Sequence, residues 1–423
     1  MRIKFWDNKI LNLDLPAELF GSNLIALPAL VDPHVHFRMP GGENKEDWQT
    51  AAQAAIAGGV TTVFDMPNNT PAIVDEKALL DKKKLIDSQL AEAEIPLRYH
   101  LYFGATPDNL DEIEKVKNQI IGIKLFMGSS TGDLLVDKKE DQERVFKKAA
   151  ELNLLVAVHA EDEECIRESV ERSKGLSRVE PRDQKIKRSD GKIAPAKLHS
   201  KIRSREAAVK AVTQALGLAR KYATKLYILH VSAKEELDLI RQAKNDGINV
   251  YAEATPHHLI LNENDYARLG TKAQMNPPLR TKADNDALWQ AIKDGTIDTV
   301  GTDHAPHTLA EKNLPYGQAP SGVPGIENYL AILLNAHHEG KITLEKIVEL
   351  THDNPQKIFG LEANDDLVIV DLDKTRVVRD GEQKTKCKWS PYAGMMLRGW
   401  AVAVVLRGRV YGGSPTTLSL HLR

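Results

Sequence analysis

The sequence predicts an α/β fold, a (β/α)8 barrel of the TIM type with a small second domain. Eight short apolar runs rich in β-branched residues alternate with longer segments of helical period, and several runs end on a histidine or an aspartate. Strands that are apolar on both faces and alternate with helices form a parallel sheet covered by helices. An open doubly wound sheet fits this alternation too. The count of eight and the polar strand ends favour the closed barrel.

Each expected strand is a short apolar run followed by turn residues. In chain order the strands are Leu30–His36, Val60–Met66, Leu97–Phe103, Ile121–Met127, Leu154–His159, Leu226–Val231, Val250–Thr255 and Ile297–Thr302. The expected helices between them are amphipathic: Lys45–Ala57, Asp75–Ala91, Lys138–Leu152, Ser204–Tyr222, Ala233–Asp246 and Lys282–Lys293. A charged segment, Arg172–Arg203, interrupts the pattern after the fifth strand, and we expect an exposed excursion there.

The two ends of the chain have a different pattern. They contain short alternating runs such as Leu367–Val370 and Ala401–Leu406, separated by glycine turns and with little helical period. We therefore expect a small β-sandwich-like domain built from residues 1–27 and 363–423, with the barrel spanning residues 28–362.

Composition excludes several classes of function. The chain has 57 Lys and Arg against 59 Asp and Glu, a formal net charge of −2, so no basic field is available to hold a nucleic acid. No apolar run approaches the roughly 18 residues of a spanning helix, and the first residues lack a signal-peptide core, so we expect no membrane partner. Cys165 and Cys387 are the only cysteines, and two plain thiols are typical of a reducing compartment. The expected location is the cytoplasm.

Metal-ligating side chains stand where the strands are expected to end. His34 and His36 end the first strand, and residues two apart on a strand share one face. His159, His230 and Asp303 end the fifth, sixth and eighth strands. Because the carboxyl ends of all strands in a parallel barrel meet at one rim, these groups should lie together. Imidazole and carboxylate are ligands of zinc and similar cations, so the pattern predicts a metal site.

Lys124 is a lone cation in the apolar run Ile120–Met127. An unpaired lysine is costly to bury, and the alternative is a side chain that extends its ammonium to the rim. A lowered pKa would instead let the neutral amine take up carbon dioxide. The carbamate formed is an anionic ligand with two oxygens. With such a bridge, two metal ions roughly 3.5–4 Å apart become feasible.

A series of motifs runs through the expected barrel. It begins with DPHVHFR, followed by Pro40, Gly41 and the KED of residues 45–47, and continues with GGVTTVFDMPNNTP, KLFMGSS, VHAED, LHVS, ATPHHL, MNPPLR, GTDHAPH and APSGVPGIE. In this order the motifs resemble those of the amidohydrolase superfamily and, within its cyclic amidohydrolase branch, the dihydroorotases. Met39 precedes Pro40 where that family usually has an acidic residue, and the segment before the first histidine is short for the family.

The resemblance implies roles for individual residues. The implied ligands of two zinc ions, bridged by carboxylated Lys124, are His34, His36, Lys124, His159, His230 and Asp303, with Asp303 also the general base and acid. The implied substrate contacts are Arg38, Asn68, Asn276 and His307, with backbone groups from Pro320 to Gly322. Side-chain chemistry agrees with these roles. A guanidinium forms bidentate hydrogen bonds to a carboxylate, and an asparagine amide both donates and accepts hydrogen bonds. Asn69 is an alternative to Asn68, and His257 and His258 receive no role.

The implied activity is the reversible interconversion of L-dihydroorotate and N-carbamoyl-L-aspartate in pyrimidine synthesis. Allantoinase and a dihydropyrimidinase-like enzyme are alternatives of the same chemistry, and a non-catalytic scaffold protein is an alternative of another class. Substrates of dihydropyrimidinase need not carry a carboxylate, so an arginine that binds a carboxylate is less expected in that enzyme. A scaffold should lack ligands, whereas all the implied positions are filled. The expected partners are the small-molecule substrate and a second copy of the chain in a homodimer.

Overall fold

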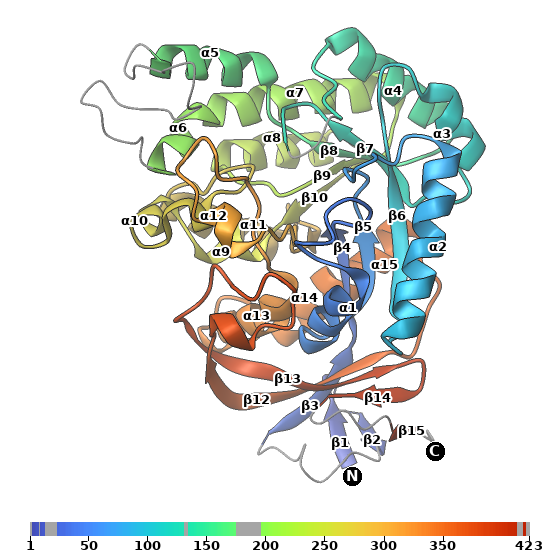
Figure 1. Cartoon of the computed structure of the whole chain (residues 1–423), viewed down its shortest axis with the longest axis vertical. Coiled ribbons are helices and arrows are strands. Elements are labelled where there is room, and N and C mark those ends of the chain that lie inside the picture. Colours follow the sequence, from blue (N-terminus) through green and yellow to red (C-terminus); the bar gives the residue numbers. More distant parts are fainter. Residues whose placement is uncertain are drawn as a thin grey trace.

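The computed structural model describes residues 2–7, 9–12, 23–130, 134–174, 196–412 and 418–419. Eight parallel strands form one sheet in which each strand pairs with the next along the chain (Figure 1). They are β4 (Leu30–Val35), β5 (Val60–Asp65), β6 (Arg98–Gly104), β7 (Gly122–Phe126), β8 (Val156–His159), β9 (Leu226–Ile228), β10 (Val250–Ala254) and β11 (Thr299–Val300). All eight predicted strands are therefore confirmed.

The sheet curls into a nearly closed barrel. Val35 and His304 form a parallel bridge between the first strand and the segment after the last one, and the His36 N–H donates to the His304 carbonyl over 2.8 Å. β11 is shorter than the range predicted for it because the chain leaves the ladder at its end. The N–H and hydroxyl of Thr302 both donate to the carboxylate of Asp32 instead of to a backbone partner.

Helices cover the outside of the barrel (Figure 1). The six predicted ones are present as α1 (Trp48–Ala57), α2 (Glu76–Glu92), α4 (Lys139–Glu151), α7 (Arg205–Tyr222), α8 (Lys234–Asn245) and α11 (Lys282–Asp294). Their starts follow from capping: Asp47, Asp75 and Ser204 each accept a hydrogen bond from an N–H of the first turn. Helices that the sequence did not predict are α3 (Leu110–Val116), α5 (Glu163–Lys174), α6 (His199–Ile202), α9 (Pro256–Ile260), α10 (Tyr266–Leu269), α12 (Leu309–Lys312), α13 (Tyr329–His338), α14 (Leu344–Val348) and α15 (Asn354–Phe359).

The two ends of the chain form a separate sheet below the barrel (Figure 1). Its strands are β1 (Arg2–Phe5), β2 (Ile10–Asn12), β3 (Leu24–Pro28), β12 (Leu367–Val377), β13 (Met396–Leu406), β14 (Arg409–Tyr411) and β15 (Leu418–Ser419), in the order β15-β14-β13-β12-β3-β1-β2. Val368 and Val370 on one face join the barrel core, whereas Ile369 on the other face belongs to a small second core. The described strands thus form one layer whose partner is the barrel, where the sequence suggested a sandwich.

The expected excursion Arg172–Arg203 is only partly described, and the expectation is wrong for its last residues. Residues 175–195 lie outside the described part of the chain. His199, Ile202 and Arg203 are buried. The reason is that the guanidinium of Arg280 donates to the Arg203 carbonyl over 2.6 Å and draws this segment against the barrel.

Two further expectations concern chemistry outside the site. Cys165 and Cys387 are both buried and free, and burial raises the pKa of the Cys165 thiol to about 11 and that of Cys387 to about 12. Both behave as plain thiols. Among the helices in the described ranges, none has the length and apolar character needed to cross a membrane.

Candidate metal centre

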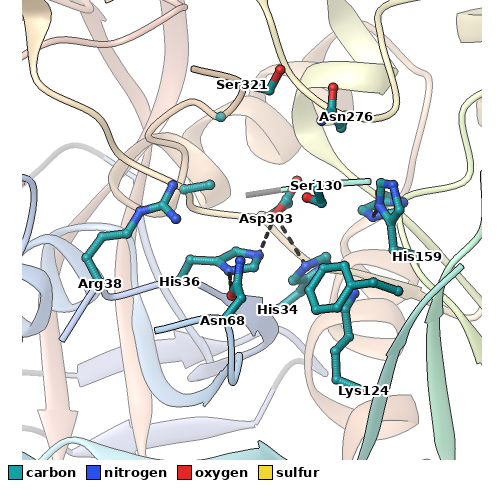
Figure 2. A pocket seen from close by; sticks show the side chains of 14 residues that line it. His34, His36, Arg38, Asn68, Lys124, Ser130, His159, Asn276, Asp303 and Ser321 are labelled. Carbon is teal, nitrogen blue, oxygen red and sulfur yellow. Dashed lines mark hydrogen bonds and ion pairs between the residues drawn. The ribbon is translucent and has the colours of Figure 1, made fainter. Parts of the chain in front are cut away.

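A cavity opens at the carboxyl ends of the barrel strands (Figure 2). The sequence-predicted residues in its wall are His34, His36, Arg38, Asn68, Lys124, His159, His230, Asn276, Asp303 and Gly322, and the others are Phe126, Ser130, Ala305 and Ser321. The cavity brings together side chains from strands that are far apart in the sequence. This is where enzymes with a parallel barrel carry their active sites.

Asp303 joins His34, which lies in β4, and His36, which directly follows that strand. Its Oδ1 lies 3.2 Å from Nε2 of His34 and 3.1 Å from Nε2 of His36. The ligand atoms of these three residues all lie within 4.8 Å of one another, close enough for one cation. Their spacing in the sequence produces this arrangement, because His34 and His36 leave the chain on the same side.

The other two histidines form a second pair. Nδ1 of His159 lies 3.0 Å from Nε2 of His230, so the two rings are joined by a hydrogen bond. The rings of His34 and His230 have centroids 5.4 Å apart, which makes the four imidazoles one continuous cluster.

Burial sets the protonation states that a metal needs. It lowers the pKa of His36 to about 3 and that of His230 well below its usual range. Burial alone would raise the pKa of Asp303, but its interactions with His34 and His36, including a hydrogen bond from His36, hold it well below its usual range. Neutral imidazoles beside an ionised carboxylate are the form that binds divalent cations. The donor set therefore fits such an ion.

Three oxygen acceptors orient the histidine rings. Oε1 of Glu253 lies 2.8 Å from Nδ1 of His34, and Oδ1 of Asn68 lies 2.7 Å from Nδ1 of His36. Oε2 of Glu161 lies 3.1 Å from Nε2 of His159. Metal-ligating histidines ordinarily donate their second N–H to such an acceptor, which fixes the tautomer. For His34 and His36 the nitrogen left over, Nε2, is the one that faces the cluster. Nε2 of His159 also lies 3.2 Å from the Arg203 guanidinium, which can only donate, so Glu161 alone does not fix the tautomer of that ring.

Sequence reasoning missed Glu253 and Glu161, both fully buried. A signal was present for Glu253, which stands in the apolar strand VYAEA just as Lys124 stands in its own strand. A buried carboxylate needs donors, and Glu253 obtains them from the His34 ring, the Tyr227 hydroxyl and the His230 N–H.

Lys124 differs from the other buried lysines of the described chain, Lys82 and Lys312. Lys82 forms an ion pair with Asp65, and Lys312 donates to three main-chain carbonyls at 2.8–3.0 Å. The described residues offer Lys124 no hydrogen bond, and its ammonium lies 4.5 Å above the Phe126 ring. Burial lowers the pKa of Lys124 to about 7, but it does the same for Lys312. The lack of hydrogen-bond partners is what singles out Lys124.

Three cavity residues hold a backbone conformation that side chains rarely adopt. The φ angles are 66° at Arg38, 40° at His230 and 46° at Asp303. Non-glycine residues at positive φ are uncommon, and they concentrate at functional sites. Arg38 shows why this matters. β4 has ended before it, so strand alternation does not set the direction of its side chain, and Arg38 lines the cavity wall with a positive φ.

Two of the predicted substrate contacts lie behind the wall. His307 is fully buried, with Nε2 3.1 Å from Nη2 of Arg38, so it contacts Arg38 and not the cavity. Pro320 does not line the cavity because its carbonyl accepts from the Lys312 ammonium; Ser321 and Gly322 line it instead. Only glycine fits at residue 322, where φ is 135° and a Cβ would lie 2.5 Å from the Ala305 carbonyl oxygen.

Asn68 and Asn69, the two candidates for one substrate contact, have different surroundings. Asn68 lines the cavity. Asn69 faces away from it, since its amide donates to the Met39 carbonyl and accepts from the Lys82 ammonium. His257 and His258 are buried beside this region without lining the cavity.

A barrel of this topology with a histidine and aspartate cluster at its carboxyl rim defines a class, the hydrolases that act on amides with a bound divalent cation. The amidohydrolase family model matches residues 25–410. The dihydroorotase of Halobacterium salinarum is 35% identical over 392 residues, covering 90% of this chain and 85% of the relative. The dihydroorotase of Methanosarcina mazei is 34% identical over 416 residues, covering 92% of this chain and 84% of the relative. This chain therefore belongs to the amidohydrolase family and, within it, to the dihydroorotases.

Two further likenesses extend the comparison. The multifunctional protein CAD of Squalus acanthias is 36% identical over 389 residues, which is 92% of this chain but 15% of that protein. The chain thus spans a small part of the length of CAD. Among solved structures, the L-hydantoinase (dihydropyrimidinase) of Arthrobacter aurescens superimposes with a TM-score of 0.84 at 26% identity, covering 98% of this chain and 93% of that one.

Proposed function

We propose that the protein is a dihydroorotase that interconverts L-dihydroorotate and N-carbamoyl-L-aspartate, a step of pyrimidine synthesis. The observation that carries this proposal is Arg38 in the wall of a cavity that also holds the histidine and aspartate cluster. A guanidinium beside bound cations is electrostatically unfavourable unless an anion lies between them. Dihydroorotate supplies that anion as its carboxylate.

The residues proposed to hold two zinc ions are His34, His36, Lys124, His159, His230 and Asp303, with Lys124 carboxylated. A bound divalent cation supplies Lewis acidity, which polarises a carbonyl and lowers the pKa of water. The amine of Lys124 has a lowered pKa, and its contact in the described chain is the Phe126 ring and not a hydrogen-bond partner. Both features support the carbamate. Glu253, Glu161 and Asn68 would hold the rings of three of the ligands in place.

Asp303 is proposed to move the proton. Its carboxylate is ionised in the resting protein, so it can accept a proton from the attacking water. It then delivers that proton to the ring nitrogen that leaves when the amide bond breaks. The same residue acts as base and then acid, as a reversible reaction requires.

Arg38, Asn68, Asn276 and the backbone at Ser321 and Gly322 are proposed to hold the substrate. His307 supports Arg38 from behind and contacts no substrate in this proposal. The division of the chain at residues 28 and 362 and the homodimer stay predictions. Expression of residues 28–362 alone and the hydrodynamic mass of the full chain test them.

Hydantoinases and allantoinases share this fold and chemistry, so substrate choice is the decisive test. Arg38→Met should leave folding and metal content unchanged. It should lower kcat/KM on dihydroorotate by roughly 10²-fold or more, because a hydrogen bond to a charged group is worth about 1.5–3 kcal/mol and more when buried. The measurement is hydrolysis of dihydroorotate, dihydrouracil and allantoin side by side, with metal content determined on the same sample.

The control for this variant is its activity on dihydrouracil, which has no carboxylate. That activity should start low and fall much less than the activity on dihydroorotate. An equal loss on both substrates would show that Arg38 supports the architecture of the site, and the carboxylate contact would then have to be assigned elsewhere.

A further inference from the structure

We propose that His199 is a positioning residue that fixes the side-chain amide of Asn276 with its NH2 group toward the cavity. The proposal rests on the dihydroorotase function above and deepens it. It assigns to Asn276 the recognition of a substrate carbonyl oxygen, to which the amide donates. His199 itself was not among the residues that the sequence analysis singled out.

The hydrogen bonds of His199 determine its tautomer and the orientation of the Asn276 amide. Its Nε2 lies 2.9 Å from the Met275 carbonyl oxygen and 2.9 Å from Oδ1 of Asn276. A main-chain carbonyl only accepts, so Nε2 must carry the hydrogen. The atom of Asn276 that faces this N–H must therefore be the oxygen, because an NH2 group there would set two donors against each other.

The opposite end of the imidazole agrees with this tautomer. Nδ1 then has a free lone pair, and the Tyr316 hydroxyl, 3.2 Å away, can donate to it. Both side chains are buried, and their rings meet edge to face with centroids 5.7 Å apart. A chain of hydrogen bonds thus runs from Tyr316 through His199 to the oxygen of Asn276.

The NH2 group is left for the cavity. Asn276 belongs to the cavity wall. In Figure 2 it lies above the predicted metal ligands with its oxygen directed away from them. An amide held in this way offers donors only, so it selects a ligand with a carbonyl oxygen at that point and disfavours one with an N–H there.

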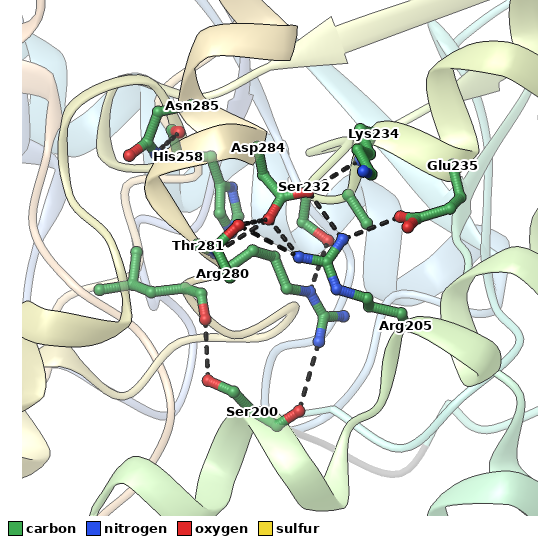
Figure 3. A network of polar contacts seen from close by, with 12 residues as sticks. Ser200, Arg205, Ser232, Lys234, Glu235, His258, Arg280, Thr281, Asp284 and Asn285 are labelled. Carbon is green, nitrogen blue, oxygen red and sulfur yellow. Dashed lines mark hydrogen bonds and ion pairs between the residues drawn. The ribbon is translucent and has the colours of Figure 1, made fainter.

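Polar contacts link the segment that carries His199 to the segment that carries Asn276, and Figure 3 shows part of this network around Ser200, Arg280 and Asp284. The Ser200 hydroxyl donates to the Leu279 carbonyl over 2.8 Å, and the Arg280 guanidinium donates to the Arg203 carbonyl over 2.6 Å. Arg205, at the start of α7, forms an ion pair with Asp284 at the start of α11. These contacts hold the imidazole against the amide, as a positioning role requires.

His199→Phe tests the proposal because phenylalanine keeps a ring beside Tyr316 and removes both nitrogens. We expect the KM for dihydroorotate to rise roughly 3- to 10-fold, the usual worth of one neutral hydrogen bond. The change in kcat should be smaller, and metal content should stay at the wild-type level. Asn276→Ala should raise KM at least as much.

The double variant separates positioning from a general structural effect. If His199 acts only through Asn276, His199→Phe adds nothing to Asn276→Ala. His352→Phe is the matched control, since His352 bonds to the Ala29 carbonyl at 2.9 Å before the first barrel strand. Its effect, whatever its size, should multiply with that of Asn276→Ala.

Two results would overturn the proposal. One is a double variant in which the effects of His199→Phe and Asn276→Ala multiply. The other is a wild-type KM in Asn276→Asp. This variant keeps His199 and presents only acceptor oxygens to the cavity, so it cannot donate to a substrate carbonyl. Both require a wild-type enzyme that hydrolyses dihydroorotate. A wild type without that activity contradicts the proposed function itself, so the two failures are distinguishable.

Discussion

Replacing Asp303 with asparagine is expected to lower kcat on dihydroorotate by about 10²–10⁴-fold or more, the range typical of lost acid–base catalysis. Asparagine keeps the size of the side chain and one oxygen beside His34 and His36, but it cannot carry a proton. The loss should appear in kcat and kcat/KM alike, because the proton moves only in the transition state. Steady-state kinetics in both directions of the reaction measure it.

Asp298→Asn is the matched control for this change. Asp298 lies just before β11, at the other end of the same strand, where it forms an ion pair with Lys244 at 2.6 Å. The same substitution there should leave kcat near the wild-type value. A kcat that barely changes in Asp303→Asn would mean that the proton travels by another route.

The barrel could be predicted because its strands are buried on both faces. β5 and β7, for example, are buried at every position, so each appears in the sequence as a short run of mostly apolar or β-branched residues, interrupted by Lys124 in β7 and ended by Asp65 in β5. The shortening of β11 could not be predicted, since it depends on Asp32, distant in sequence, whose carboxylate takes the N–H of Thr302. The partner of the terminal sheet could not be predicted either, because the alternation of apolar residues shows that one face of a strand is covered but not which element covers it.

The predicted ligands other than Lys124 share a rule that the sequence displays, namely a polar residue at or just after the end of an apolar strand. The substrate side has no such rule. His307 and Pro320 lie in the long connection after β11, and the chain there turns those groups toward Arg38 and Lys312. His199 was beyond prediction because its segment follows residues outside any periodic pattern, and contacts with residues distant in sequence, such as Leu279 and Arg280, bring it to the site.

The buried lysines of the described chain connect the fold to the chemistry. Lys82 and Lys312 are satisfied by partners that the fold provides, an aspartate in one case and three carbonyls in the other. A buried amine without partners is unfavourable in the apoprotein, and its neutral form is favoured. Lys124 is therefore the lysine whose environment favours reaction with carbon dioxide, and it stands beside the groups that would bind the cations.

Lys124→Ala is accordingly expected to lose most of its bound metal and nearly all activity, since the bridging ligand between the two cations is gone. The variant should fold, because no hydrogen bond of the described chain depends on the amine. Metal analysis and hydrolysis of dihydroorotate, measured on the same preparation, test both parts. Lys82→Ala offers a contrast, because it removes the ion-pair partner of the fully buried Asp65 and should chiefly lower the free energy of unfolding, by about 3–5 kcal/mol.

Chemical rescue decides whether the amine acts as a carbamate. Formate, acetate or propionate can enter the space left by the side chain and supply the two anionic oxygens, so added acid should restore part of the metal and part of the activity in Lys124→Ala. A primary amine of the same length should not, because it lacks those oxygens. The same acids should do nothing for Lys82→Ala, whose defect is an unpaired Asp65. Full activity in Lys124→Ala without any acid would end the carbamate hypothesis, and rescue by the amine would assign Lys124 the role of a cation.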